Sequence, residues 1–407
     1  MRGYRENGTG KAKSKTIKSL GYLEDLEKEY DDPIAHFKEV AKKMTEEENE
    51  RRKVTITFDM DEELPVGCEG RKNLGYAAIL RIYYELELDR FLNNDTRHKG
   101  FEYNANSIMT LLVVSRLLSP GSKRKAYEEK GRYFERFDFS LADTYRALSY
   151  FATISKELQR HVNERVTTIY GRDTRLVYYD VTNFYFEIDQ EDDLRKHGVS
   201  KEKRKDPIVQ MGLAMDADGV PLHYELFPGN MPDKSTFRSV IGEVRRNYDT
   251  GRIIVVGDMG IITGEEKYDG YYSIVTSEYG MTDDEIVETY RGLWEIEETF
   301  RITKSDLEAR PVYLSRPERI EAHFLTCFLS LVIMRLLQKR TGRKYSCENI
   351  VECLNRISCS HEQGNLYLFD YRSELSDAIA ESLDIPFGKK RFSLAEIKNL
   401  IANTKNS

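Results

Sequence analysis

The segment RLVYYDVTNFYFE, residues 175–187, constrains the fold more than any other part of the chain. An apolar, aromatic-rich run of this length predicts a central β-strand. The run carries a single acid, Asp180, in the middle of its pattern. A buried strand rarely tolerates a carboxylate that has no partner. The sequence therefore predicts a sheet whose central strand presents an acid to a site.

A second predicted strand also ends in an acid. The Ile/Val run in GRIIVVGDMG, residues 251–260, ends at Gly257 and Asp258, which predicts a buried strand whose carboxyl end delivers Asp258 into a cleft. Between the two acids, Asp218-Gly219 separates two alternating runs and predicts a hairpin. Residues 235–248, STFRSVIGEVRRNY, then predict a helix before the second strand.

A third acid lies in YRGLWEIEETFRITK, residues 290–304. If this segment is one helix, Tyr290, Glu297 and Lys304 follow one another at two-turn intervals along one face. Asp180, Asp258 and Glu297 would then supply oxygen ligands for two divalent ions, a set that suits Mg²⁺ or Mn²⁺. Each acid also has a non-catalytic alternative. An acid at a strand end often belongs to a turn, and an acid-rich helix usually exposes its charged face to solvent.

These segments together resemble the DDE transposases of bacterial insertion sequences, which have a ribonuclease-H-like catalytic core. The subgroup that the chain resembles has the signature Y-x2-R-x3-E-x6-K, and Tyr290, Glu297 and Lys304 match it in register. Leu293 stands at the arginine position. The block YYDVTNFYFE and the later segment GNMPDKSTF also resemble these proteins. The resemblance covers roughly residues 175–340.

The resemblance implies an α/β fold: a ribonuclease-H-like mixed sheet flanked by helices, between a mostly helical N-terminal region and a helical C-terminal region. It implies metal-dependent strand cleavage and strand transfer at the ends of an insertion sequence, by cut-and-paste transposition. Asp180, Asp258 and Glu297 would hold two Mg²⁺ ions. Tyr290 and Lys304 would contact DNA phosphates, with Arg301 in place of the missing arginine. The implied partners are double-stranded DNA, as terminal inverted repeats and target, and a second copy of the chain in a homodimeric DNA complex.

Two departures from the signature keep other functions open. Leucine at position 293 cannot grip a phosphate, and only 39 positions separate Asp258 from Glu297, where relatives usually carry a long β insertion. One alternative is therefore an internally deleted, catalytically impaired copy that acts as a DNA-binding remnant or inhibitor. The other is a general ribonuclease-H-like nuclease with no role in transposition.

The net charge of −7 argues against a uniformly basic nucleic-acid binder, but it leaves room for local basic patches. One basic cluster lies near the N-terminus and is equally consistent with a solubilising surface: Arg2, Arg5, Lys11, Lys13, Lys15 and Lys18. A second cluster follows Asp180 and is expected to contact DNA, above all through its last four members: Arg195, Lys196, Lys201, Lys203, Arg204 and Lys205.

The five cysteines form no C-x-x-C pair, so a disulfide framework is not expected. The apolar run FLTCFLSLVIMRLL, residues 324–337, is too short to cross a membrane and is interrupted by Arg335. It predicts a buried core helix. With no signal peptide evident, we expect a cytoplasmic protein that joins the nucleoid when it binds DNA.

Changes in pattern suggest four regions. They are a mixed basic segment at 1–70, a helical, DNA-end-binding domain at 71–170, the catalytic core at 171–313 and a helical region at 314–407. In the second region, an apolar helix ends at SPGS, residues 119–122, before the basic run KRKAYEEKGRYF. This order resembles a helix-turn-helix, although similar helical pairs are common in proteins that never bind DNA.

Overall fold

The computed structural model describes residues 2–6, 12–16, 18–51, 61, 63, 70–174, 176–188, 190–198, 205–248, 254–256, 280–310 and 312–405. Asp258 and three members of the second basic cluster, Lys201, Lys203 and Arg204, lie outside these residues. The chain begins with an antiparallel hairpin and two helices: β1 (Arg2–Glu6), β2 (Ala12–Thr16), α1 (Leu23–Leu26) and α2 (Pro33–Arg51).

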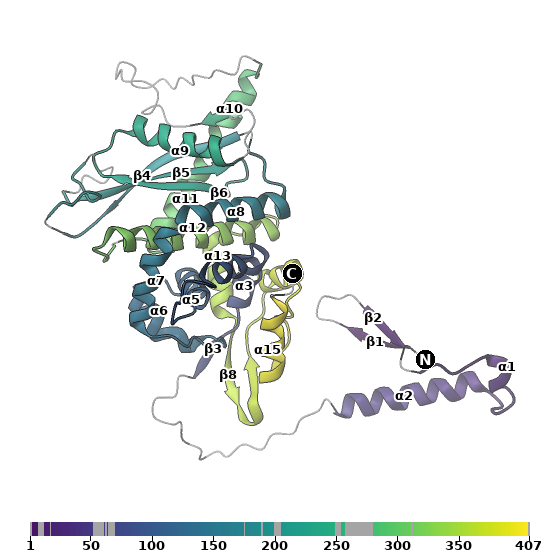
Figure 1. The fold of residues 1–407 in the computed structure, drawn as a ribbon. Coiled ribbons are helices and arrows are strands. Elements are labelled where there is room, and N and C mark those ends of the chain that lie inside the picture. The colour runs from purple at the N-terminus through teal and green to yellow at the C-terminus, as the bar shows by residue number, and fades with distance from the viewer. Residues whose placement is uncertain are drawn as a thin grey trace.

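A four-stranded mixed sheet forms the centre of the α/β part (Figure 1). Its strand order is β6 (Pro221–Pro228), β5 (Ile208–Asp216), β4 (Leu176–Tyr185) and β7 (Ile254–Val256). The strand β5 pairs antiparallel with both β4 and β6, whereas β7 pairs parallel with β4. The helix α9 (Asp233–Asn247) makes the crossover from β6 to β7. The predicted central strand, the hairpin and the helix after it are all confirmed.

The turn of the hairpin explains why Asp218-Gly219 was informative. The Asp216 carboxylate accepts the backbone N–H of Asp218 at 3.0 Å and that of Val220 at 2.9 Å. Gly219 has φ +67°, a conformation that residues with a Cβ rarely adopt. The local sequence therefore fixes the register of β5 against β6.

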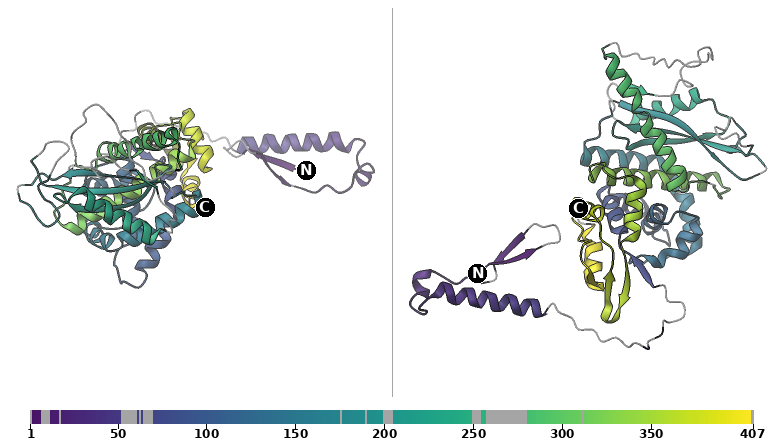
Figure 2. Two further views of the ribbon diagram at one scale, coloured as in Figure 1. Left: turned by 90° about the horizontal axis from the view of Figure 1, so that it is seen from above. Right: turned by 180° about the vertical axis from the view of Figure 1, so that it is seen from behind.

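The two faces of the sheet pack against different helices (Figures 1 and 2). Alternate β4 residues, Val177, Tyr179 and Val181, share a small apolar core with Val240 and Val244 of α9. The opposite face carries Phe184, whose ring lies 4.7 Å from that of Phe324. This second face is covered by α11 (Trp294–Arg301), α8 (Ser155–Tyr170) and α12 (Pro317–Arg340).

The long helix α12 is the central element of the main apolar core. Of the described helices, it alone is long and apolar enough to cross a membrane, but 94% of its most apolar window is buried inside the protein. This confirms the predicted core helix. The helices between β3 (Arg71–Asn73) and the sheet are α3 (Tyr76–Glu85), α4 (Leu88–Thr96), α5 (Ala105–Leu118), α6 (Lys123–Glu128), α7 (Leu141–Thr153) and α8. Of these, α3, α5 and α7 pack against α12.

The basic run after SPGS forms only a short helix. The helix α6 has six residues and is followed by a 3₁₀ turn at Glu129–Arg132. Lys123 and Ala126 of α6 are buried, whereas Arg124 and Lys125 are exposed. Tertiary packing thus removes one of its three basic side chains from the surface, and the helix-turn-helix stays a prediction.

The sequence suggested a helical C-terminal region, but the structure has strands there as well as helices. Besides α13 (Cys347–Arg356), α14 (Glu374–Leu383) and α15 (Leu394–Asn403), it holds β8 (Ser358–Glu362), β9 (Leu366–Phe369) and β10 (Arg391–Ser393). These strands form an antiparallel sheet that β3 (Arg71–Asn73) completes. Strands of three to five residues carry too little alternation to be recognised, and β3 pairs with them from a distant part of the sequence.

The sheet contains a histidine that should make stability depend on pH. His223 of β6 is buried, and its Nδ1 lies 3.0 Å from the Tyr248 hydroxyl. Its Nε2 has no hydrogen-bond partner in the part of the chain that the structure describes. Burial lowers the pKa of His223 to about 4. Because the pKa in the unfolded chain is higher, near 6.5, the unfolded chain binds more protons between these values. We expect the free energy of unfolding to fall by up to ~3 kcal/mol as the pH drops from about 6.5 to 4.

Urea titrations at several pH values would measure this dependence. The His223→Gln variant should show a flatter profile than the native chain across the same window. Burial also lowers the pKa of His323, so that residue should leave a remaining slope of the same sign. An identical slope in both proteins would contradict the assignment to His223.

Candidate active site

The first acid of the candidate site, Asp180, lies in the middle of β4 and is half-buried. Its Oδ1 accepts the backbone N–H of Val181 at 2.7 Å. Because side chains alternate along a strand, Asp180 belongs to the same face as Tyr178 and Phe184, the face that α11 covers. The strand therefore directs this carboxylate toward the helix that carries Glu297.

The segment 290–304 is not the single helix that was predicted. The helix α10 (Asp283–Arg291) ends before a turn at Gly292 and Leu293, and α11 is followed by a π-helical turn at Ile302–Asp306. Tyr290, Glu297 and Lys304 therefore lie on three successive helical pieces rather than on one straight face. Seen from behind, α10 and α11 run along the sheet toward α12 (Figure 2).

Packing against β4 accounts for the break. The Tyr178 hydroxyl donates a hydrogen bond to the Thr289 carbonyl oxygen at 3.1 Å. A Cβ added at Gly292 would overlap the hydroxyl and ring of Tyr178. Glycine is therefore the residue that lets the helix approach the strand at this point. The contact lies two residues before Asp180 on the same face of β4.

The structure gives the remaining predicted residues different surroundings. Glu297 is exposed on α11. The Lys304 ammonium lies 5.8 Å from the centre of the Phe184 ring, so it approaches the face of β4 that presents Asp180. Tyr290 is half-buried near the end of α10.

Arg301, the expected replacement for the missing arginine, and Leu293, which stands at its position, both contact other parts of the protein. The Arg301 guanidinium forms an ion pair with Asp306 at 3.4 Å. Leu293 is partly buried and packs against the main apolar core. The position that the signature gives to arginine therefore supports packing in this chain.

The second basic cluster is partly neutralised by its own acids. Arg195 pairs with Asp192 and Lys196 lies 3.8 Å from Glu191. Lys205 is exposed just before β5. Lys201, Lys203 and Arg204 stay predictions because they lie outside the described residues.

Two of the three acids predicted to hold metal, Asp180 and Glu297, lie among the described residues. Among the described residues, no three His, Cys, Asp or Glu side chains lie close enough together to hold a metal ion. The predicted set depends on Asp258, which is not among them. The strand β7 leads toward it: Val256 pairs in parallel with Tyr178. Asp258 follows Val256 by two residues, as Asp180 follows Tyr178.

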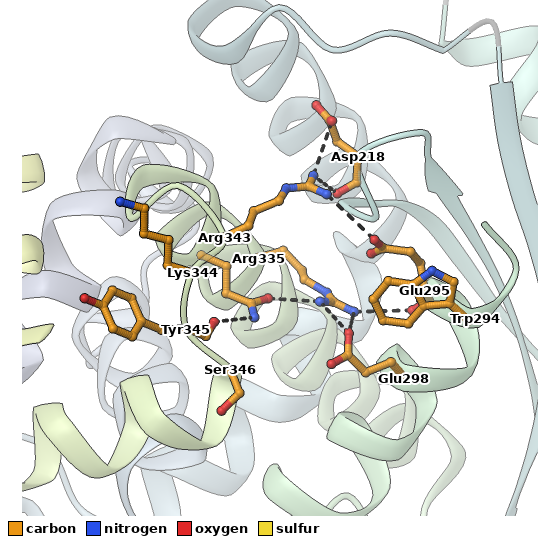
Figure 3. Close-up of a pocket in the computed structure, with 10 residues that line it drawn as sticks. Asp218, Trp294, Glu295, Glu298, Arg335, Arg343, Lys344, Tyr345 and Ser346 are labelled. Carbon is orange, nitrogen blue, oxygen red and sulfur yellow. Dashed lines mark hydrogen bonds and ion pairs between the residues drawn. The ribbon is translucent and has the colours of Figure 1, made fainter. Parts of the chain in front are cut away.

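Arg335 fixes α11 onto α12 and was not recognised from the sequence as a functional residue (Figure 3). Its guanidinium donates to Glu298 Oε2 through both terminal nitrogens at 3.0 Å, and to Thr299 Oγ1 at 2.6 Å. It also donates to Gln338 Oε1 at 2.9 Å and to the Glu295 carbonyl oxygen at 3.3 Å. An arginine inside an apolar helix signals a buried partner, and the acid-rich run around Glu297 was the place to look for one.

The β5–β6 turn supports the same helix from another side. Arg343 lies 3.2 Å from Asp218 and 3.8 Å from Glu295, and these residues line a pocket of about 190 Å³ with Trp294 and Arg335 (Figure 3). Burial raises the pKa of Glu295, while Arg335 and Arg343 oppose that shift. The helix that carries Glu297 is thus held by β4, by α12 and by the hairpin.

The Gly292 contact leads to a testable prediction. We expect Gly292→Ala to force α11 away from β4 and to lower stability, by about 1–3 kcal/mol for an overpacked site. Adding Tyr178→Phe, which removes the overlapping hydroxyl, should recover part of the loss. Thermal unfolding of the single and double variants measures both effects. The matched control is Gly280→Ala, since a Cβ at Gly280 meets nothing within 4 Å.

Comparison with known proteins supplies evidence independent of this geometry. Residues 1–55 match the family model described as IS1634 family transposase, N-terminal domain. The match supports an insertion-sequence transposase. It falls on the N-terminal segment, outside the region that carries the predicted signature. No curated protein matches the chain.

Proposed function

We propose that this chain is a DDE transposase that cuts and joins DNA at the ends of an insertion sequence by a metal-dependent, cut-and-paste reaction. The observation that carries the proposal is the placement of Asp180 on the face of β4 that the Glu297-bearing helix α11 covers. The transposase family match at residues 1–55 supports the same conclusion from a separate segment.

The sheet supports a ribonuclease-H-like core. Three consecutive antiparallel strands are followed, through α9, by a fourth strand parallel to the first. The last residue of β7, Val256, pairs with Tyr178, two residues before Asp180. If the parallel register continued for two more residues, Asp258 would lie beside Asp180.

The donor set fits a hard divalent cation. Asp180, Asp258 and Glu297 offer carboxylate oxygens, the ligands that Mg²⁺ and Mn²⁺ prefer. Two bound ions would supply a Lewis acid for the attacking hydroxyl and for the leaving oxygen of the phosphodiester. The role of the protein would be to hold the carboxylates in place. Tyr178 and Arg335 support this role for Asp180 and Glu297, because they fix the strand and the helices to one another.

Lys304, Tyr290 and Arg301 would position the DNA through its phosphates. Lys304 is the best placed of these by its approach to Phe184, and Arg301 would have to exchange its Asp306 pairing for a phosphate. Lys201, Lys203, Arg204 and Lys205 would extend the contact along the strand. Phosphate contacts carry no sequence information, so recognition of the terminal inverted repeats belongs to other parts of the chain, in a homodimeric complex in the cytoplasm.

The remnant hypothesis is favoured by one specific observation. Leu293 packs into the core at the position where the signature has a phosphate-binding arginine, and Arg301 pairs with Asp306 instead of replacing it. A chain with this arrangement and a short segment before Glu297 would bind transposon ends without cutting them. It would then act as an inhibitor of active copies.

A cleavage assay beside a binding assay separates these functions. A labelled duplex that carries the element's own flanking repeat is incubated with the full chain, with Mg²⁺, with Mn²⁺ or with a chelator. Metal-dependent nicking at the repeat end supports the transposase. Specific binding without nicking supports the remnant, and equal cutting of unrelated duplexes or RNA–DNA hybrids supports a general nuclease.

A further inference from the structure

A cluster of basic side chains lines a cavity whose described lining residues do not include Asp180 or Glu297. This cavity of about 250 Å³ is bounded by the turn between α5 and α6, by the segment that follows the π-helical turn, and by the start of α12. This volume far exceeds the ~30 Å³ that one water molecule occupies. The lining residues that matter here are Arg116, Lys123, Tyr145, Glu308, Arg310 and His323.

Two cations are buried in the wall of this cavity. Arg116 and Lys123 are only 4% and 5% exposed. Arg116 donates to the carbonyl oxygens of Leu307 and Glu308 and to that of Gly121, and its Nε has no hydrogen-bond partner among the described residues. In the part of the chain that the structure describes, no carboxylate forms an ion pair with either residue.

The Lys123 amine has a histidine as its hydrogen-bond partner among the residues that the structure describes. Its Nζ lies 2.9 Å from His323 Nδ1, while His323 Nε2 lies 3.1 Å from the Ala309 carbonyl oxygen. The His323 ring can therefore accept from Lys123 and donate to Ala309. Burial and the neighbouring Arg116 hold the pKa of Lys123 well below its usual range, so the surroundings disfavour its charged form.

Buried charges in proteins are normally paired, because an unpaired one costs several kcal/mol of desolvation. In the described part of the chain, no acid pairs with Arg116 or Lys123, and an anion beside them would favour the protonated form of Lys123. Among the cavity-lining residues named above, Glu308 is the one acid, and its side chain is exposed. An anion inside the cavity would supply the missing charge and accept hydrogen bonds from the wall.

The cavity is next to the strand that carries Asp180. The Arg310 guanidinium lies 5.9 Å from the centre of the Tyr185 ring at the end of β4. The neighbouring β4 residue, Phe184, is the one that Lys304 approaches. Arg310 therefore links the cavity wall to the carboxyl end of β4, the strand that carries Asp180.

We propose that this cavity binds a phosphate group, and that in the working complex the group is a backbone phosphate of the DNA strand held at the candidate active site. The choice of DNA as the source of the phosphate rests on the proposed function. The anion site itself rests only on the cavity and its buried cations.

The first test uses inorganic phosphate alone. Phosphate should raise the melting temperature of the native chain above that in chloride of equal ionic strength, as expected for a ligand that binds only the folded state. The shift should be lost in Lys123→Met and reduced in Arg310→Gln, whose half-buried side chain makes misfolding a smaller concern. The control is Arg136→Gln, because the side chain of Arg136 is 90% exposed and pairs with Asp138 at the surface.

The second test measures duplex binding without metal at several salt concentrations. Loss of one phosphate contact should reduce the slope of log K against log salt by about 0.9. We expect this reduction in Arg310→Gln and Lys123→Met, but not in Arg136→Gln. An unchanged slope in both cavity variants would overturn the DNA assignment.

The outcomes separate this site from the proposed function. A phosphate-induced shift that depends on Lys123, in a chain that neither binds nor cuts the duplex, supports the anion site and overturns both its DNA source and the transposase function. The opposite outcome overturns the anion site alone. In that case the native chain cuts DNA with metal, while the folded cavity variants equal it in the phosphate-induced shift and in the salt slope.

Discussion

Replacing Glu297 by glutamine is expected to abolish metal-dependent cleavage while leaving the fold and DNA binding intact. Glutamine has the same shape but lacks the charge that a divalent ion requires. A metal-held transition state gains several kcal/mol of charge stabilisation, so losing one carboxylate ligand should slow cleavage by at least about 100-fold. Glu297 is exposed on α11, so its replacement should change the free energy of unfolding little.

The control for this experiment is Glu288→Gln. Glu288 is an exposed glutamate of α10, the helix that precedes α11 across the turn at Gly292. Cleavage of a labelled repeat-end duplex, measured with Mg²⁺ and with Mn²⁺, should be lost in one variant and retained in the other. Full cleavage by Glu297→Gln would remove this residue from the metal site and overturn the three-acid hypothesis.

Strong local patterns made much of the sheet predictable from the sequence. The central strand, the Asp218-Gly219 hairpin and α9 each bury a face set by their own alternation or helical period. The core helix was predictable for the same reason, since nearly every residue between Phe324 and Leu337 is apolar. Where a segment's structure follows from its own residues, pattern and structure agree.

The break in the helix before Glu297 depends on a distant residue instead. Nothing in YRGLWEIEETFRITK marks a turn strongly, because Gly292 adopts ordinary helical angles, φ −61° and ψ −13°. The turn follows from Tyr178, which occupies the space beside Gly292 from another element. The short strands β8–β10 were missed for a related reason, because their sheet is completed by β3 from the other end of the core.

The candidate site was predictable as a list of residue types, but not as an arrangement. Asp180 and Glu297 were chosen by position in their patterns, and the structure places their elements in contact. Asp258 remains a prediction. Arg335 and the hairpin turn, which support α11, could not be recognised from the sequence. Each acts through contacts between elements that are remote in sequence.

The second large effect is expected at Arg335, whose replacement by leucine should weaken both stability and cleavage. Leucine suits the apolar surroundings of α12, but it leaves the Glu298 carboxylate and the Thr299 hydroxyl without their guanidinium partner. Breaking a buried ion pair from one side costs about 3–5 kcal/mol. We expect the lower end of that range, about 3 kcal/mol, because Glu298 is 25% exposed. Urea unfolding of the purified variant measures this loss.

A double variant shows whether the effect comes from the unpaired acid. Arg335→Leu combined with Glu298→Leu removes both charges and should regain most of the lost stability, since apolar replacement of a whole buried pair is often neutral. Arg343→Leu is the matched control: its side chain is 40% exposed, so it should cost less than about 1 kcal/mol. Cleavage by Arg335→Leu, measured where the variant is folded, should fall by about 100-fold if α11 shifts by an ångström. Native cleavage in a destabilised Arg335→Leu chain would mean that Arg335 stabilises the fold without positioning Glu297.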